Sequence, residues 1–337
     1  MDRVLALLVS SLVVAGCSSS APKRLIGGDA VLAGVSIDQK WVTVLTGTTR
    51  LLTGAHVGTL EVVPTLGGPP TILDGRSSGG VFNRGTTLWY LGGVTVVSEG
   101  TPPSDHVYGA LFVWTPSMAA PIKLGDNVRE YYVSQDGTSA VFIDWSKQTI
   151  DPANTGTLTT VSASSCVAGA CNKIVIADGV TLAETAWHIA NNGKRVLATV
   201  RGALATDPGK VVLVAPESGQ VQLLSTGVNV RSALMSPAGD TVGWLEGANE
   251  IHVLPAAGGA QTVIVPTSPL VDAVAMIDAA NFVAKTRELA TGPAALAKVS
   301  ATATTPLPVD RPQQFFVSQA VAGKTDRYVF FQLATIA

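Results

Sequence analysis

The stretch Ala233-Leu234-Met235-Ser236-Pro237-Ala238-Gly239-Asp240-Thr241-Val242-Gly243-Trp244-Leu245 decides how this chain folds. Its apolar start leads into Ser-Pro-Ala-Gly-Asp, where proline and glycine favour a tight turn. Thr241 to Leu245 then supplies the β-branched and aromatic residues that favour a strand. Ile251 to Leu254 and Gln261 to Val265 predict two more strands on either side of a second turn, Pro255 to Gly259. Four strands in about 40 residues are typical of one blade of a β-propeller.

The same unit recurs along the chain. Its first turn is predicted, at spacings of roughly 40 to 56 residues, at Ile37–Lys40, Asn83–Gly85, Gln135–Gly137, Asn191–Gly193, Pro237–Gly239, Asp278–Ala280 and Ala322–Lys324. Its second turn is predicted at Thr65–Pro69, Pro116–Ala119, Cys166–Cys171, Pro216–Gly219, Pro255–Gly259 and, less regularly, Ser300–Thr304. The strands after the first turns are apolar almost without alternation, which indicates burial on both faces. Blades packed between two neighbours have this property.

We therefore predict an all-β fold, with residues 31–337 forming a β-propeller. Seven blades are expected, the last of them, from Gln313, being incomplete. A ring of six blades with an appended C-terminal hairpin is the alternative. Closing the ring requires an N-terminal strand in the last blade, and Lys23 to Ala30 is the segment available for it.

Two units carry a more specific signal. Ser134–Phe142 and Ser236–Trp244 resemble the Ser-Pro-Asp-Gly repeat of the TolB-like (WD40-like) propellers. The resemblance is close in these two units, loose in the others, and extends over residues 31–337. Most units lack the Pro-Asp-Gly core. The resemblance to these propellers implies the propeller fold. It carries over no binding partner from any member of the family.

The beginning of the chain predicts export. Val4 to Val14 is an uncharged apolar run that follows Arg3 and is too short to span a bilayer. It ends in Val14-Ala15-Gly16-Cys17, which resembles the lipobox of bacterial lipoproteins. A plain secretory signal with an accidental cysteine, or a buried N-terminal helix, is the alternative.

The lipobox resemblance implies a signal peptide over residues 1–16 and lipid attachment at Cys17. Residues 17–30 would then form a flexible tether, and several acyl chains on one cysteine would make a stable anchor. In a bacterium with two membranes, Ser18 after the cysteine implies the outer membrane, facing the periplasm or the cell surface. The membrane is thus one expected partner.

Cys166 and Cys171 remain as a pair once Cys17 is acylated. They flank a predicted second turn, where a disulfide would close a hairpin and stabilise it by roughly 2 kcal/mol. A metal site is disfavoured, because no histidine or further cysteine lies near enough in the sequence to complete four ligands. Export from the cytoplasm favours oxidation.

Two motifs resemble catalytic elements but lack the neighbouring structure or residues that those elements require. Gly75-Arg76-Ser77-Ser78-Gly79 matches a nucleophile elbow, which needs a helix after the serine, whereas Gly80 to Leu91 predicts another hairpin. We therefore expect an inter-blade link around Ser77. Ala322-Gly323-Lys324-Thr325 resembles the end of a phosphate-binding loop, but Ser318 stands where the opening glycine is required. No catalytic residue is predicted.

The titratable residues predict no metal or cofactor site. The four histidines, His56, His106, His188 and His252, fall in different units without metal-ligand spacing. We expect His252 to be packed within a strand, and His56 and His106 to lie in long loops. Five acidic residues are predicted to lie in loops: Glu99, Asp105, Asp151, Asp207 and Glu288. They could converge as a carboxylate pair or a calcium site. The simpler interpretation is that they form a solvated rim.

Antiparallel connectivity predicts two different faces. First and second turns should gather on one, and the middle loops on the other, the longest being Thr46–Gly58, Gly93–Gly109, Ser146–Gly156, Arg201–Gly209 and Thr286–Gly292. Long loops on a rigid scaffold often carry recognition. The alternative is that they are tolerated insertions.

The formal net charge of -2 gives no general attraction to nucleic acid. The sequence favours a lipid-anchored binding or scaffold module of the cell envelope, with an unidentified protein or glycan partner. The alternative is a propeller hydrolase or lyase whose central channel is lined by carboxylates, histidine or a metal. A purely structural subunit of an envelope assembly is a third hypothesis.

Overall fold

The computed structural model describes residues 30–83, 85–99, 103–149, 151–166, 169–202, 204, 206–291, 293–310, 312–317 and 329–333. Within these residues the protein is all-β, with no α-helix and two short 3-10 segments, η1 (Ala163–Ser165) and η2 (Leu182–Glu184). No helix in the described ranges is long and apolar enough to cross a membrane. The described residues do not include the predicted signal peptide, Cys17 or most of the predicted tether. They also do not include the first turn predicted at Ala322–Lys324.

The strands pair antiparallel in chain order. The first sheet contains β1 (Val31–Val35), β2 (Trp41–Arg50), β3 (His56–Pro64) and β4 (Thr71–Ser77). A seven-stranded sheet follows, with β5 (Gly80–Val81), β6 (Leu88–Glu99), β7 (Ser104–Trp114), β8 (Ile122–Val133), β9 (Ser139–Trp145), β10 (Gly156–Ser162) and β11 (Lys173–Val180).

Three four-stranded sheets and a two-stranded sheet complete the described chain. They are β12 (Thr185–Ile189), β13 (Val196–Val200), β14 (Lys210–Ala215) and β15 (Gln220–Ser225); β16 (Arg231–Met235), β17 (Thr241–Glu246), β18 (Glu250–Pro255) and β19 (Thr262–Ile264); β20 (Leu270–Met276), β21 (Asn281–Arg287), β22 (Ala295–Ser300) and β23 (Thr304–Asp310); and β24 (Pro312–Val317) with β25 (Val329–Leu333). The unit from which the prediction began, β16 to β19, is confirmed strand by strand.

One strand departs from the predicted scheme of separate units. The first half of β8 pairs with β7 and its second half with β9, with a register shift between Val128 and Tyr131. The Asp144 carboxylate accepts hydrogen bonds from the backbone N–H groups of Asp126 (3.2 Å) and Asn127 (2.9 Å). These bonds hold the connecting residues in place, so β8 serves as the last strand of one unit and the first strand of the next.

The middle strands are buried on both faces, as predicted. In β9, Ala140 and Phe142 face one hydrophobic core, whereas Val141 and Ile143 face another. The same division recurs in β6, β13, β14 and β17, so that each described core is shared by two successive units. Sheets that pack face to face in this way can be stable only together, because either face alone would expose apolar surface.

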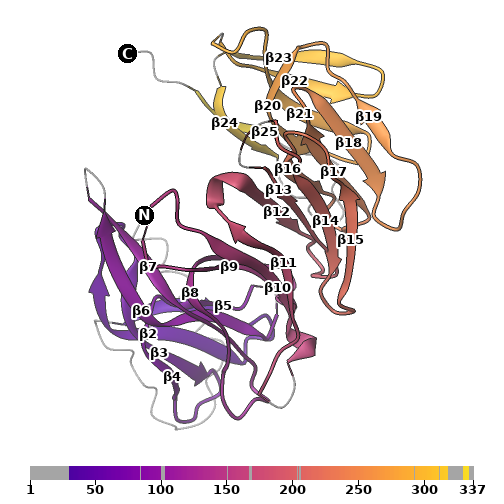
Figure 1. Cartoon of the computed structure of the whole chain (residues 1–337). Helices are drawn as coiled ribbons and strands as arrows, with labels where there is room; N and C mark the ends of the chain where they lie inside the picture. The colour runs from indigo at the N-terminus through magenta and orange to yellow at the C-terminus, as the bar shows by residue number, and fades with distance from the viewer. Residues whose placement is uncertain are drawn as a thin grey trace.

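The first strands of successive units lie against one another: β1 against β5, β12 against β16, β16 against β20, and β20 against β24. Figure 1 shows the sheets following one another in chain order, from β2–β4 in indigo and purple to β24 and β25 in yellow. Adjacent first strands and face-to-face sheets are the arrangement expected of propeller blades.

Hydrogen bonds join the first turns of successive units. The N–H groups of Ile37, Asp136 and Asn191 donate to carbonyl oxygens in the next turn, those of Gly85 (3.2 Å), Asn191 (3.0 Å) and Pro237 (2.9 Å). We call these joined turns, residues 36–40, 82, 83, 85, 134–138, 190–193 and 236–240, the turn layer. Second turns lie beside it, since the N–H of Thr65 donates to Lys40 O and that of Ala256 to Asp240 O. The predicted gathering of tight turns on one face is confirmed for these units.

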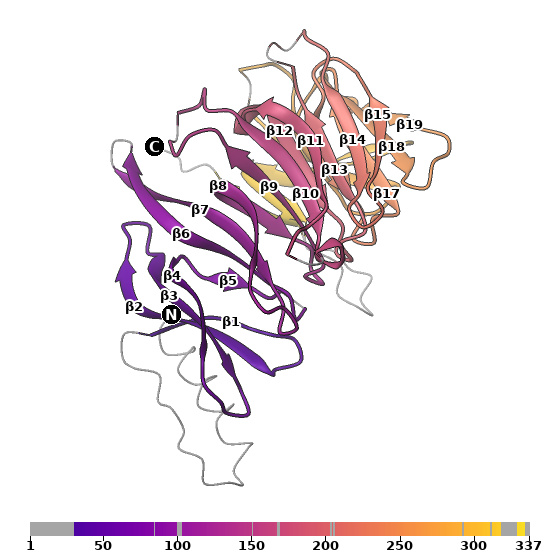
Figure 2. The ribbon, with the colours of Figure 1, turned by 60° about the horizontal axis from the view of Figure 1, so that its bottom comes forward.

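The opposite face differs from the prediction in two places. Residues 46–58 and 93–109 were expected to be loops, but they are mainly paired strand: β2 and β3 close around a turn at 51–55, and β6 and β7 form one long hairpin (Figure 2). β-branched residues explain the difference, because Val96 pairs with Val107 across the hairpin. The Asp105 carboxylate in β7 accepts a hydrogen bond of 2.6 Å from Leu52 N–H, which joins the two hairpins.

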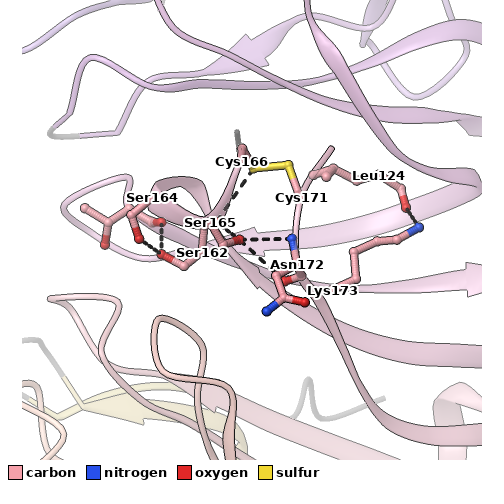
Figure 3. The surroundings of a disulfide bond; sticks show 9 residues. Leu124, Ser162, Ser164, Ser165, Cys166, Cys171, Asn172 and Lys173 are labelled. Carbon is pink, nitrogen blue, oxygen red and sulfur yellow. Dashed lines mark hydrogen bonds between the residues drawn. A yellow bond between two sulfur atoms is a disulfide. The ribbon is translucent and has the colours of Figure 1, made fainter. Parts of the chain in front are cut away.

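Cys166 and Cys171 form a disulfide at the second turn between β10 and β11, as predicted (Figure 3). Around it, Ser165 Oγ donates to Ser162 O (2.6 Å) and accepts from Asn172 N–H (3.2 Å). Lys173 Nζ donates to Leu124 O at 2.9 Å, which ties the start of β11 to β8. The residues on either side of the bridge are therefore already held by hydrogen bonds.

Removal of this bridge is expected to reduce stability measurably. The double variant Cys166→Ser with Cys171→Ser should lower the free energy of unfolding by about 2 kcal/mol, because a short loop loses its cross-link in the unfolded chain. Urea denaturation of the oxidised protein and the variant measures the difference. Dithiothreitol should shift the wild-type midpoint to that of the variant and leave the variant unchanged; equal midpoints without reductant would contradict the prediction.

Candidate functional site

A pocket of about 660 Å³ lies where β8 and β12 meet the turn layer. Its wall is made of the ends of these first strands, and its rim of the first turns of three units. Its lining comprises two aromatic residues, three amides, one histidine and two aliphatic residues: Tyr132, Trp187, Asn83, Gln135, Asn191, His188, Val133 and Ile189. Among the described residues that line the pocket there is no carboxylate, lysine or arginine.

The two aromatic residues come from neighbouring first strands. Tyr131 and Tyr132 alternate at the end of β8: Tyr131 OH donates to Trp89 O (3.2 Å), while the Tyr132 residue stays 55% exposed. In β12, Trp187 packs partly against the core between β9 and β13. The rings of Tyr132 and Trp187 meet edge to face, with centroids 5.7 Å apart and planes at 72°. The pair thus presents aromatic surface to the pocket.

His188 lies beside Trp187 in β12 and is partly buried. Burial lowers the pKa of its imidazole below the ordinary value of 6.5, since desolvation penalises the charged form. The histidine is therefore mainly neutral at pH 7, and none of the lining residues in the described part of the chain carries a formal charge there.

The turn layer positions the rim. Asn83 has a positive φ of 49°, a conformation that asparagine tolerates better than most residues. Its Nδ2 donates to Val133 O (3.1 Å) and Ser134 O (2.8 Å), which fastens the turn before β6 to the end of β8. The hydrogen bonds of Asn191 to the neighbouring turns do the same on the β12 side. The pocket rim is thus held by side-chain and backbone hydrogen bonds between the turns of four successive units.

The other histidines do not join this pocket. His252 is only 7% exposed and lies in β18, where its ring stacks on Trp244 with centroids 5.2 Å apart, so the prediction that it is packed is confirmed. His56 begins β3 and His106 lies within β7. The expectation that these two lie in loops is wrong, because the hairpins that contain them extend farther than predicted.

The predicted loop acids are held separately. The carboxylates of Asp151, Asp207 and Glu288 accept hydrogen bonds within their own or an adjacent loop, from Ala153 N–H (2.9 Å), Leu204 N–H (2.9 Å) and Ser268 Oγ (3.1 Å). Asp105 departs from the solvated-rim interpretation, being 8% exposed and bonded to Ser98 and Leu52. Nowhere in the described ranges do three or more His, Cys, Asp or Glu residues form a group that could hold a metal.

Ser77 ends β4 and is fully buried. Its Oγ donates to Leu91 O at 2.6 Å and accepts a hydrogen bond from Gly79 N–H, and the chain continues into β5 with no helix between. The predicted link between units is confirmed, and the serine lacks the setting of a nucleophile elbow.

A second pocket, of about 320 Å³, lies on the middle-loop face between β8, β9 and η2. Arg129 contributes to it, with its guanidinium carbon 5.7 Å from the Tyr108 ring and 5.6 Å from the Trp145 ring, and its Nε 2.6 Å from Glu130 Oε1. Asn154 bonds to Ser146, Lys147 and Thr149. The Asn154 contacts lie within the loop that follows β9, and the Arg129 contacts join β8 to β7 and β9, so these polar groups have a structural role.

The comparisons with known proteins assign no family. No protein-family model matches the sequence, and no curated protein is significantly similar to it. Among solved structures, the chain is similar to TolB from Acinetobacter baumannii, with 15% identity, 78% of this chain and 63% of that chain covered, and a TM-score of 0.39. An oligogalacturonate lyase in complex with manganese shares 12% identity, over 83% of this chain and 76% of that one, with a TM-score of 0.44.

An acylaminoacyl peptidase from Pyrococcus horikoshii is also similar, with 10% identity and a TM-score of 0.42, over 85% of this chain and 47% of that one. The chain thus spans less than two thirds of the TolB and peptidase chains. At these identities and TM-scores, the solved structures assign no activity, ligand or partner to this protein.

Sequence reasoning missed the residues of the larger pocket. It placed recognition on the middle-loop face, whereas this pocket lies at the turn layer. One signal was available: Tyr132 and Trp187 stand a few residues before a predicted first turn. In a propeller, such residues belong to the innermost strands.

Proposed function

We propose that this protein is a lipid-anchored binding module of the bacterial cell envelope. In this proposal the successive sheets close into a seven-bladed propeller, and residues before β1 complete the last blade together with β24 and β25. The pocket between β8 and β12 takes up a protein or glycan partner at the channel mouth. The chain is anchored through Cys17 in the outer membrane.

The observation that carries the binding function is the lining of the larger pocket. A few placed polar groups around exposed aromatic surface are typical of ligand sites. The alternative of a channel enzyme requires clustered carboxylates, histidines or a metal, whereas the lining residues that the structure describes include one histidine, His188, and no carboxylate. The disulfide supports an oxidising compartment outside the cytoplasm.

Fractionation of the bacterial envelope tests the anchor and the binding function together. The tagged wild-type chain should enter the detergent-rich phase and co-purify with a partner at stoichiometric level. Cys17→Ser should move to the soluble fraction and lose fatty-acid labelling, because one cysteine carries the whole anchor.

Ser18→Ala is the matched control, since it changes a neighbouring residue and leaves the cysteine. It should remain in the membrane and keep its label. Labelling of the Cys17→Ser variant would contradict the anchor, and a wild-type chain that captures neither an envelope protein nor a glycan would contradict the binding function.

A further inference from the structure

The aromatic pair of the larger pocket has an unusual balance of packing and exposure. The ring of Trp187 packs against the core behind β12, and the Tyr132 ring contacts it edge to face, with an angle of 72° between the ring planes. Tyr132 is nevertheless 55% exposed, although its neighbour Tyr131 is turned inward. The fold thus keeps a large amphipathic side chain on the pocket wall, against the tendency to bury it.

The polar groups of the pocket are amides. Asn83, Gln135 and Asn191 each have a carbonyl oxygen that accepts and an NH₂ group that donates hydrogen bonds. Asn83 uses its donors to hold the rim, which leaves its carbonyl oxygen as an acceptor. Such groups match hydroxyls, which are also both donors and acceptors.

None of the described residues that line the pocket carries a formal charge, which narrows the ligand class further. A charged group that entered the pocket would lose hydration without meeting an opposite charge, which is costly. The volume of about 660 Å³ lies within the usual range for small-molecule sites.

We propose that the pocket between β8 and β12 binds an uncharged carbohydrate, whose ring C–H face packs on Tyr132 and Trp187 and whose hydroxyls bond to polar groups of the rim, among them the carbonyl oxygen of Asn83. This inference rests on the proposed binding function and specifies its ligand. The sugar ring combines one apolar face with hydroxyl edges, and the pocket offers aromatic surface beside amides.

A peptide partner is the competing occupant. Peptides that are captured by strand addition pair with a free strand edge. β12 is the edge strand of its sheet, but β16 lies against it. The described surroundings of the pocket therefore favour side-chain recognition of a sugar over main-chain recognition of a peptide.

The test uses the full-length protein, an array of neutral oligosaccharides and tetragalacturonate as the acidic probe. We expect saturable binding of a neutral oligosaccharide by calorimetry, and weaker binding of tetragalacturonate by about tenfold or more. Saturation-transfer NMR should show contact through the ring C–H protons of the sugar. Absence of binding by every neutral oligosaccharide, or tighter binding of the acidic probe, would overturn the inference.

Variants locate the binding in this pocket. Tyr132→Ala should weaken binding by about tenfold or more, whereas Tyr132→Phe, which keeps the ring, should retain it. Leu223→Ala, at a side chain exposed on β15, is the control elsewhere on the surface. Because Tyr132 is largely exposed, its alanine variant should keep its fold, which circular dichroism checks. Unchanged affinity of Tyr132→Ala would overturn the assignment to this pocket.

The outcomes separate the two proposals. If no glycan binds but an envelope protein is captured by the wild type and lost with Tyr132→Ala, the carbohydrate inference is wrong and the binding function stands. If neither glycan nor protein is captured, both are wrong.

Discussion

Trp89→Ala is expected to lower the free energy of unfolding by about 3–5 kcal/mol, as large-to-small changes of buried aromatic residues do. Trp89 is fully buried in β6, within the core between the units of β6 and β9. Its indole Nε1 also donates to Gly137 O at 2.9 Å, in the first turn of the next unit. The variant therefore loses apolar packing and leaves a buried carbonyl without this donor.

Urea denaturation measures this loss. Trp89→Phe is the matched variant, because it keeps most of the ring volume and removes the N–H donor. Its free energy of unfolding should therefore fall by less than that of Trp89→Ala. Leu223→Ala, at an exposed position, should change the free energy by no more than about 0.5 kcal/mol. A Trp89→Ala midpoint close to that of Leu223→Ala would show that the core between these two units does not carry the stability assigned to it.

Gly85→Ala is expected to destabilise the protein by about 1–3 kcal/mol, the usual range for overpacking. A Cβ at Gly85 would lie 2.5 Å from the backbone carbonyl oxygen of Asp136 in the neighbouring turn. Since that atom is backbone, relief requires the two turns to separate. The hydrogen bond from Ile37 N–H to Gly85 O would be disturbed as well.

Gly75→Ala is the control, because a Cβ there meets nothing within 4 Å. Neither glycine has the positive φ that would strain an alanine, so the pair isolates the close approach between turns. Thermal unfolding should separate the two variants clearly. Equal melting temperatures would contradict the close packing of the turn layer.

The strand pattern could be predicted from the sequence because it depends on local chemistry. The unit at β16 to β19 has its turns marked by proline and glycine, and its strands by β-branched residues. The burial of β9 on both faces followed from its unbroken apolar run. The disulfide followed from the spacing of Cys166 and Cys171 at a turn.

The errors arose where distant pairing overrides local signals. Glycines at 92, 93 and 109 suggested a loop, but pairing of Val96 with Val107 extends the hairpin past them. The shared strand β8 depends on Asp144, which lies in another strand and bonds to the link from a distance. The pocket was missed because Tyr132 and Trp187 are 55 positions apart in the sequence and meet only through the packing of two units.

The dual role of β8 limits how this chain can change its length. Repeat proteins commonly gain or lose whole repeats, because each repeat is an interchangeable module. Here a deletion that removes one of the two units joined by β8 would take away a strand from the other. Duplication of one of these units is disfavoured for the same reason, because both units share β8. We therefore expect no insertion or deletion of a whole module between residues 80 and 180. The tyrosine at position 132 then keeps its place relative to Trp187.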